Sequence, residues 1–195
     1  MIFRMIQIAV VLAVALAGGT YMTWYSIRGT DKFGAVTIGG WIAYPDAGTS
    51  VADPYAKARL ARDASLSLGA AEGVTFFAER DETGSRLSGS CSYLITGASP
   101  SARIWTLFAV GNDQIPLKLA DATWPVSLHS SSIIYENAGG FRIMVSASAR
   151  PDNWLAVQRG QRFVLAFTLY DSPVATNKGL IETTFPKVDK VNCDA

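Results

Sequence analysis

The sequence predicts a mainly β domain, an antiparallel β-sandwich or jelly-roll-like fold with one short helix, preceded by one N-terminal transmembrane helix. Three observations predict this fold class. An apolar run occupies the first 27 residues, short apolar segments separated by turn residues follow it, and one capped segment has helical periodicity. Because helical patterns do not alternate with the strand patterns, a parallel α/β fold is not expected.

Residues 1–27 form the predicted membrane anchor. Twenty of these 27 residues are apolar, and no charged side chain lies between Arg4 and Arg28. A helix over residues 5–27 spans about 34 Å, which is enough to cross a hydrocarbon layer of ~30 Å. Aromatic residues of the kind found at the headgroup level end the run, namely Tyr21, Trp24 and Tyr25.

A cleaved signal peptide is the alternative interpretation of this segment. Arg4 supplies a basic start, and Ala15-Leu16-Ala17 matches an A-x-A cleavage site. The apolar run continues for ten residues beyond that site, which favours retention. Both interpretations carry the rest of the chain to the membrane or across it. Basic residues flank the run on both sides, so they do not decide its orientation.

The two cysteines, Cys91 and Cys193, both follow the apolar run. An even pair in an exported domain usually forms a disulfide, and two separate buried thiols are the alternative. A bridge would close a loop of about 100 residues and stabilise the fold by about 4 kcal/mol in the chain-entropy model. We therefore expect the domain that follows the anchor to lie outside the cytoplasm.

A polar linker over residues 28–34 and one extracytoplasmic β domain over residues 35–195 are expected after the anchor. Strands are predicted over residues 36–44, 73–79, 87–96, 103–110, 132–136, 141–148 and 163–170. Gly, Pro and Asn residues between them suit tight turns. The predicted helix has Asp53 as its N-cap and Pro54 at its first position, with Ala56, Leu60 and Ala64 recurring every four residues.

Charge and motifs exclude several classes of function. The net charge is +1, and the part that follows the anchor is neutral, so a nucleic-acid partner is not expected. The sequence contains no phosphate-binding glycine loop, H-E-x-x-H, C-x-x-C or G-x-S-x-G motif, so no cofactor is expected. One histidine and two cysteines leave little material for a metal site, and none is predicted. For His129, a surface or locally hydrogen-bonded side chain is favoured over a catalytic base.

No catalytic residue is identified. The candidate ligand-binding residues are polar or aromatic side chains on the predicted helix or near turns, namely Tyr55, Arg59, Glu72, Arg103 and Trp154. Arg59 suits an anion or a polar ligand, although a solvated helix face is the simpler interpretation. Glu72 lies among small residues and suits a structural ion pair with an arginine, which we favour, or a general acid with a raised pKa.

The order and spacing of several short motifs resemble the DUF1214 family of domains of unknown function. The motifs run from about residue 36 to the end and include Gly40-Trp41, Ala52-Asp53-Pro54-Tyr55-Ala56, Ala71-Glu72-Gly73, Cys91-Ser92-Tyr93, Asn153-Trp154-Leu155 and Leu169-Tyr170-Asp171. The resemblance implies a mostly β domain of bacterial proteins, often behind one membrane helix, and it supports the cysteine pairing. It implies no reaction or substrate. Ala156 and Phe167-Thr168 depart from the proline and the Leu-Arg pair common in the family.

These observations favour a single-pass protein of the bacterial inner membrane whose periplasmic domain binds a ligand or partner without chemistry. The expected partners are the lipid bilayer, through residues 5–27, and an envelope glycan or a membrane protein. One alternative is an enzyme, a hydrolase or lyase, that acts on an envelope glycan or small metabolite through Glu72, Asp81 or Asp152. Another is an accessory subunit of a membrane complex, in which small residues at positions 13, 17 and 18 contact a partner helix.

Overall fold

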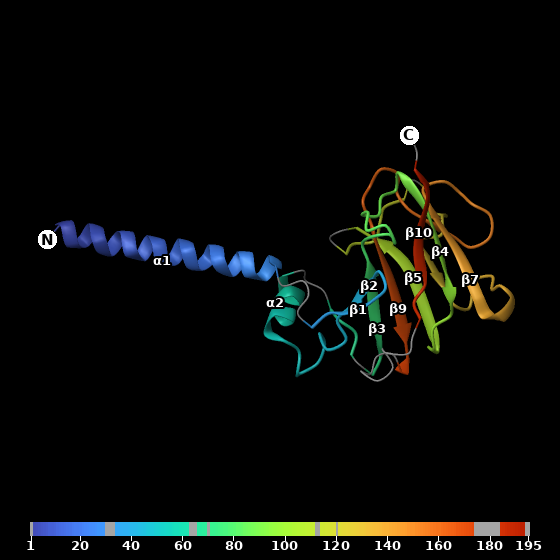
Figure 1. Cartoon of the computed structure of the whole chain (residues 1–195), viewed down its shortest axis with the longest axis horizontal. Helices are drawn as coiled ribbons and strands as arrows, with labels where there is room; N and C mark the ends of the chain where they lie inside the picture. Colours follow the sequence, from blue (N-terminus) through green and yellow to red (C-terminus); the bar gives the residue numbers. More distant parts are fainter. Residues whose placement is uncertain are drawn as a thin grey trace.

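The computed structural model describes residues 2–29, 34–62, 66–69, 71–111, 114–119, 121–173 and 184–193, without the side chains of residues 27–29, 59 and 138. Two β-sheets pack together, and a long helix, α1 (Ile2–Gly29), extends away from them (Figure 1). A short helix, α2 (Pro54–Arg62), lies between the end of α1 and the sheets, and a 3-10 turn, η1 (Asn137–Gly139), precedes one strand. The predicted mainly β sandwich with one short α-helix behind a long apolar helix is confirmed.

The larger sheet has six strands in the order β1-β2-β3-β9-β5-β6, and the smaller has four in the order β10-β4-β7-β8. The strands of the larger sheet are β1 (Val36–Ile38), β2 (Trp41–Ala43), β3 (Gly73–Ala78), β9 (Val164–Tyr170), β5 (Ile104–Val110) and β6 (Ser127–His129). Those of the smaller sheet are β10 (Lys187–Cys193), β4 (Cys91–Ala98), β7 (Gly140–Ser146) and β8 (Trp154–Ala156). Paired strands are antiparallel, except that β7 and β8 are parallel.

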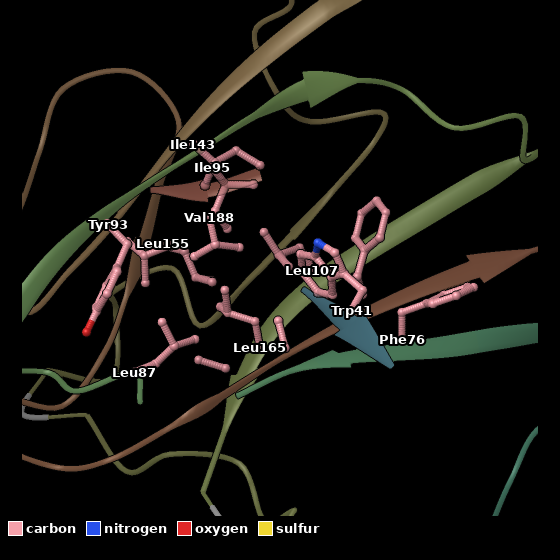
Figure 2. Close-up of a cluster of buried hydrophobic side chains, with 14 of the residues drawn as sticks. Trp41, Phe76, Leu87, Tyr93, Ile95, Leu107, Ile143, Leu155, Leu165 and Val188 are labelled. Carbon is pink, nitrogen blue, oxygen red and sulfur yellow. The ribbon is translucent and has the colours of Figure 1, made fainter. Parts of the chain in front are cut away.

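The hydrophobic core lies between the two sheets. Alternate residues along the strands face inward, as a period of two requires. The larger sheet contributes Trp41, Phe76, Trp105, Leu107, Leu165 and Phe167. The smaller sheet contributes Tyr93, Ile95, Phe141, Ile143, Leu155 and Val188. Figure 2 shows side chains from both sheets meeting in this layer.

β9 is the central strand of the larger sheet, and six of its seven residues are buried. The ring of Phe167 lies 5.6 Å from that of Trp41 and 5.2 Å from that of Trp105, measured between centroids. Aromatic pairs in this range stabilise a fold by about 1 kcal/mol each beyond the burial of their area. At the next position, the hydroxyl of Thr168 is hydrogen-bonded to that of Thr75 at 2.9 Å. The strand is therefore held on both of its faces.

Trp41 also connects the larger sheet to the chain that enters β10. Its indole Nε1 donates a hydrogen bond of 2.6 Å to the carbonyl of Pro186, which directly precedes β10. A Cβ atom on Gly97 of β4 would come within 2.8 Å of the Cα atom of Pro186. Only glycine leaves room for this crossing, so Gly97 is needed for the path of the chain into the smaller sheet.

The predicted disulfide is confirmed. Cys193 of β10 lies directly opposite Cys91 of β4, and the bridge joins residues 102 positions apart. Of the β10 side chains, only Val188 is buried. The covalent link therefore attaches a strand whose own side chains provide little hydrophobic contact.

Three details of the predicted strands are wrong. Residues 36–44 form a hairpin of β1 and β2, because Gly39 adopts a φ of 59° and turns the chain. Residues 132–136 are not a strand, because the side chain of Asn153 occupies both backbone hydrogen-bonding groups of Ile134. The strands β6, β8 and β10 were not predicted, since β6 and β8 have three residues each and β10 is mostly exposed and polar.

The two helices follow their sequence signals. Asp53 caps α2 as predicted, with its Oδ1 atom accepting a hydrogen bond of 2.8 Å from the amide of Tyr55. In α1, the most apolar 18 residues of the stretch Ile2–Ser26 have a mean hydropathy of 2.0, and none of the stretch is buried in the protein. A membrane anchor and a signal sequence share these properties.

Candidate functional site

Three charged residues lie at one end of the larger sheet. β3 and β5 begin there and β9 ends there, because β9 runs antiparallel to both. The amide of Asp171 donates to the carbonyl of Glu72 at 3.1 Å, and the amide of Arg103 donates to the carbonyl of Tyr170 at 3.1 Å. Glu72, Arg103 and Asp171 therefore lie on three adjacent strand ends, and we call them the sheet-end cluster.

Arg103 and Asp171 form an exposed ion pair in the sheet-end cluster. Nε of Arg103 lies 3.4 Å from Oδ2 of Asp171, and the side chains are 77% and 67% exposed. Such a pair contributes at most about 1 kcal/mol to stability, and its guanidinium has further donors for a carboxylate or phosphate. Asp171 has a φ of 49°, a left-handed conformation that aspartate tolerates better than most residues. Asp171 was not among the predicted ligand-binding residues. Its position directly after a continuous apolar strand could have identified it as a polar residue at a strand end.

The ion pair predicted between Glu72 and an arginine is not formed within the described part of the chain. Glu72 is exposed, and its Oε2 atom accepts a hydrogen bond of 3.1 Å from the amide of Gly69. Its own amide donates to the carbonyl of Gly69 at 2.8 Å. The carboxylate thus closes the turn that leads into β3. The prediction failed because the small residues around Glu72 form this turn at the surface and do not bury the side chain.

Tyr55 and Arg59 lie on α2, which the chain joins to Glu72 through residues 66–69. The side chain of Tyr55 is 46% exposed, whereas that of Arg59 lies outside the described residues. A Cβ atom on Gly48 would lie 2.7 Å from the hydroxyl of Ser67, so the loop before α2 and the segment after it are in close contact. Two of the five predicted ligand-binding residues, Glu72 and Arg103, therefore lie at the same end of the larger sheet. Two others, Tyr55 and Arg59, lie on α2, which the chain connects to Glu72.

Trp154 belongs to the edge of the smaller sheet and lies apart from the sheet-end cluster. It is 9% exposed, and its Nε1 atom donates to the carbonyl and the hydroxyl oxygen of Ser146, each at 3.1 Å. Its ring meets that of Trp124 edge to face, with the centroids 5.4 Å apart. These contacts leave little of the indole surface for a ligand.

The neighbouring Asn153 is buried, and we call it a clamp because its side chain is hydrogen-bonded to two segments of the backbone. Its Oδ1 atom accepts a hydrogen bond of 2.7 Å from the amide of Ile134. Its Nδ2 atom donates to the carbonyls of Ile134 at 2.7 Å and Arg142 at 2.9 Å. Residues 132–136 are thereby attached to β7. Asp152, directly before it, is exposed and has a φ of 62°.

Asp81 is a buried carboxylate that follows β3, at the opposite end of this strand from Glu72. Its Oδ1 atom accepts hydrogen bonds from the amide and hydroxyl of Thr83 and from the amide of Ser85, at 2.9, 2.5 and 3.0 Å. Its Oδ2 atom has no hydrogen-bond partner among the described residues and lies 3.9 Å from Nζ of Lys190 in β10.

These contacts determine the charge state of Asp81. Burial alone would raise the pKa of its carboxyl, but the hydrogen bonds from Thr83 and Ser85 and the charge of Lys190 outweigh burial. The pKa therefore lies below the ordinary value of 3.8. The ionised carboxylate shapes the turn at residues 81–85 and holds β10 through Lys190, which is a structural role.

The three carboxylates considered as acid and base do not share a site. Glu72 and Asp81 lie at opposite ends of β3, and Asp152 precedes β8 in the smaller sheet. Two carboxylates that act together in glycoside hydrolysis lie about 5–9.5 Å apart across one cleft. Glu72 and Asp152 are also exposed, which is not the desolvated setting of a general acid.

Two hollows in the described part of the molecule are not lined by the sheet-end cluster. One of about 170 Å³ is apolar and lies beside β5 and β6, lined by Phe108, Ala109, Pro116, Leu117, Leu119, Val126, Ser127 and Ala156. A shallow depression of about 680 Å³ lies beside α2, lined by Ala47, Gly48, Thr49, Leu60, Ala61, Leu66 and Ser67.

Within the described ranges, no three His, Cys, Asp or Glu side chains are grouped so as to hold a metal ion. His129 is exposed, with Nδ1 3.1 Å from the hydroxyl oxygen of Ser131, as predicted.

The fold and the sheet-end cluster define a disulfide-linked β-sandwich domain behind an apolar helix. The chain belongs to the DUF1214 family, described as "protein of unknown function", which matches residues 72–174, just over half of the 195 residues. The resemblance in the sequence extended further, from about residue 36. The hairpin of β1 and β2 and the helix α2 therefore lie outside the family match.

Two solved structures of bacterial proteins are similar to this chain. The VPA0106 protein from Vibrio parahaemolyticus is 21% identical, with a TM-score of 0.58 over 73% of this chain and 36% of its own. A putative uncharacterized protein from Burkholderia cenocepacia is 17% identical, with a TM-score of 0.47 over 94% of this chain and 53% of its own. The chain thus spans about a third to a half of the length of these proteins. A search of the curated proteins found no match.

Replacing Asn153 tests its role as a clamp. Asn153→Asp should lower the free energy of unfolding by about 3 kcal/mol, because a buried carboxylate oxygen would face the carbonyls of Ile134 and Arg142 without a proton to donate. Urea unfolding measures this loss. Asp152→Asn makes the reverse exchange at the exposed neighbouring position and should change stability by less than about 0.5 kcal/mol. Equal losses in both variants would contradict the role of Asn153.

The contacts of Asp81 predict a loss of stability in acid. Because the pKa of Asp81 is lowered in the folded protein, its carboxylate stabilises the fold above pH 3.8. This stabilisation is lost as the pH falls through the folded-state pKa. Asp81→Asn should remove this component, so that unfolding free energy measured against pH falls less steeply below about pH 4. Glu82→Gln, at an exposed carboxylate in the same turn, is the control and should leave the profile nearly unchanged. A profile unchanged in Asp81→Asn would be incompatible with this assignment.

Proposed function

We propose that this chain is a membrane-anchored, extracytoplasmic domain of the bacterial inner membrane that binds a ligand or partner in the periplasm and performs no chemistry. One observation carries the proposal: the apolar side chains of α1 are not covered by the sandwich. Leu16 is 68% exposed and Val11 65%, and no part of Ile2–Ser26 is buried. An apolar surface of this size needs a hydrocarbon environment.

The aromatic residues and the disulfide support this arrangement. The rings of Tyr21 and Trp24 lie 6.2 Å apart, and those of Tyr21 and Tyr25 lie 6.4 Å apart, near the end of the apolar stretch. Amphipathic rings gather at the headgroup level in this way. The Cys91–Cys193 bridge favours an oxidising compartment. Together the apolar helix and the disulfide point to a location outside the cytoplasm. In this proposal residues 1–27 are the anchor, 28–34 the linker and 35–195 the domain.

The sheet-end cluster supports a binding role. Its side chains are exposed, come from three strand ends and include a guanidinium that accepts planar anionic partners. A carboxylate or sugar of the envelope, or a polar segment of a membrane protein, fits such a surface. The separation of the candidate acid–base carboxylates favours binding over hydrolysis.

Cell fractionation tests the anchor. The full chain should sediment with membranes, resist extraction with alkaline carbonate and keep residues 1–27 in its intact mass. Leu12→Arg combined with Val14→Arg should cost about 6 kcal/mol of insertion free energy and release the protein from the membrane. Ile134→Arg, at a side chain that is 63% exposed in the sandwich, should leave the fractionation unchanged. A soluble, shortened domain from the unaltered chain would support signal-peptide cleavage and contradict the anchor.

A thermal-shift screen of the detergent-solubilised chain tests binding. An envelope glycan or carboxylate at a hundredfold excess over Kd should raise stability by about 2.7 kcal/mol. Arg103→Ala should abolish that shift. Arg142→Ala is the matched control, since Arg142 also forms an exposed ion pair, 3.1 Å from Glu136, on the other sheet. Loss of the shift in both variants, or a shift that persists in Arg103→Ala, would count against the sheet-end cluster.

A further inference from the structure

The helix α2 lies where α1 would leave the membrane. α1 and α2 contact each other, and Figure 1 shows α2 beside the end of α1, between that helix and the sheets. The apolar stretch of α1 ends at Ser26, one turn before the end of the helix. If α1 crosses a bilayer, as the proposed function states, α2 is held at the level of the headgroups.

Large apolar side chains are exposed in the segments that precede and follow α2. Val51, which precedes the helix, is 80% exposed, and Leu66, which follows it, is 100% exposed. Their segments are neighbours, because Thr49 and Leu66 line the same shallow depression. Tyr55, in the first turn of α2, is 46% exposed. Residues of this kind in adjacent segments suit an interface with lipid.

The polar residues of α2 are basic. Residues 54–62 contain Lys57, Arg59 and Arg62 and no acidic residue. The Lys57 amine donates a hydrogen bond of 3.1 Å to the carbonyl of Ser50, which places its charge beside the loop that carries Val51. Arg62 is exposed. Two acidic residues flank the helix in the sequence: Asp53 precedes it and is used as its cap, and Asp63 follows it. A short helix with basic and apolar neighbours complements anionic headgroups.

We propose that α2, with residues 47–51 and 66–69, is a second membrane contact that seats the domain on an anionic lipid surface. We call these residues the α2 face. The inference rests on the proposed anchoring by α1 and goes beyond it, because an anchor followed by a linker would otherwise leave the sandwich free to rotate. Since residue 69 is bonded to Glu72, the sheet-end cluster would then lie close to the lipid surface.

Photo-crosslinking of the full chain in lipid nanodiscs tests this. A photoreactive phenylalanine derivative is placed at position 51 or 66, at position 134 as an exposed control in the sandwich, and at position 12 within α1. In nanodiscs of phosphatidylethanolamine and phosphatidylglycerol, positions 51 and 66 should give at least about tenfold more lipid adduct than position 134, measured by mass spectrometry. Position 12 should give adduct in every lipid.

The charges are tested in the same system. Lys57→Gln with Arg62→Gln should reduce the adducts at positions 51 and 66, and so should nanodiscs of phosphatidylcholine alone. Arg142→Gln with Arg150→Gln removes the same charge from β7 and the loop after it, and should leave the adducts unchanged. Adduct at position 12 without adduct at 51 and 66 would overturn the α2 face and leave the anchor intact. Loss of adduct at position 12 would instead overturn the anchor and the inference that rests on it.

Discussion

The packing of β9 between β3 and β5 is the constraint on which the other features depend. Phe167 lies against Trp41 and Trp105 from neighbouring parts of the larger sheet, and this aromatic layer provides the surface on which the smaller sheet packs. The direction of β9 also decides where the polar groups lie. Because β9 runs opposite to β3 and β5, its last residue meets their first residues, and Glu72, Arg103 and Asp171 come together. Burial in the centre of the sheet thus positions an exposed cluster at its end.

Elements with a strong apolar period were predictable, and elements held by other interactions were not. The segments that became β3, β5, β7 and β9 carry enough inward-facing residues to be recognised alone. β10 buries only Val188 and is held by a disulfide and by pairing with β4, which no local pattern encodes. Residues 132–136 have the composition of a strand, but the amide of Asn153 takes the place of a strand partner. Side-chain clamps of this kind depend on residues distant in the chain.

The candidate site was predictable in its residue types but not in its geometry. Glu72 and Arg103 were identified as polar residues next to strands, yet their proximity depends on a strand that begins 92 positions after Glu72. Trp154 was chosen because it is an aromatic residue beside polar groups near a turn, whereas its indole nitrogen is bonded to Ser146 inside the protein. Asp81 was considered as a catalytic acid, whereas its hydrogen bonds make it a turn residue that holds Lys190. A sequence shows which polar residues are present, but it does not show which of their hydrogen bonds are made within the folded protein.

The long separation between paired strands has a consequence for synthesis and export. β3 pairs with β9, joining Gly73 to Tyr170, and the disulfide joins Cys91 to Cys193. A sandwich with such distant pairings has a high contact order, so it folds slowly and only after most of the chain has been made. The ribosome must release the chain up to Tyr170 before the central strand can pair with β3 along its full length. During that interval the domain is unfolded and Cys91 is not yet joined to Cys193, which is the form that a secretion channel would thread on the proposed route out of the cytoplasm.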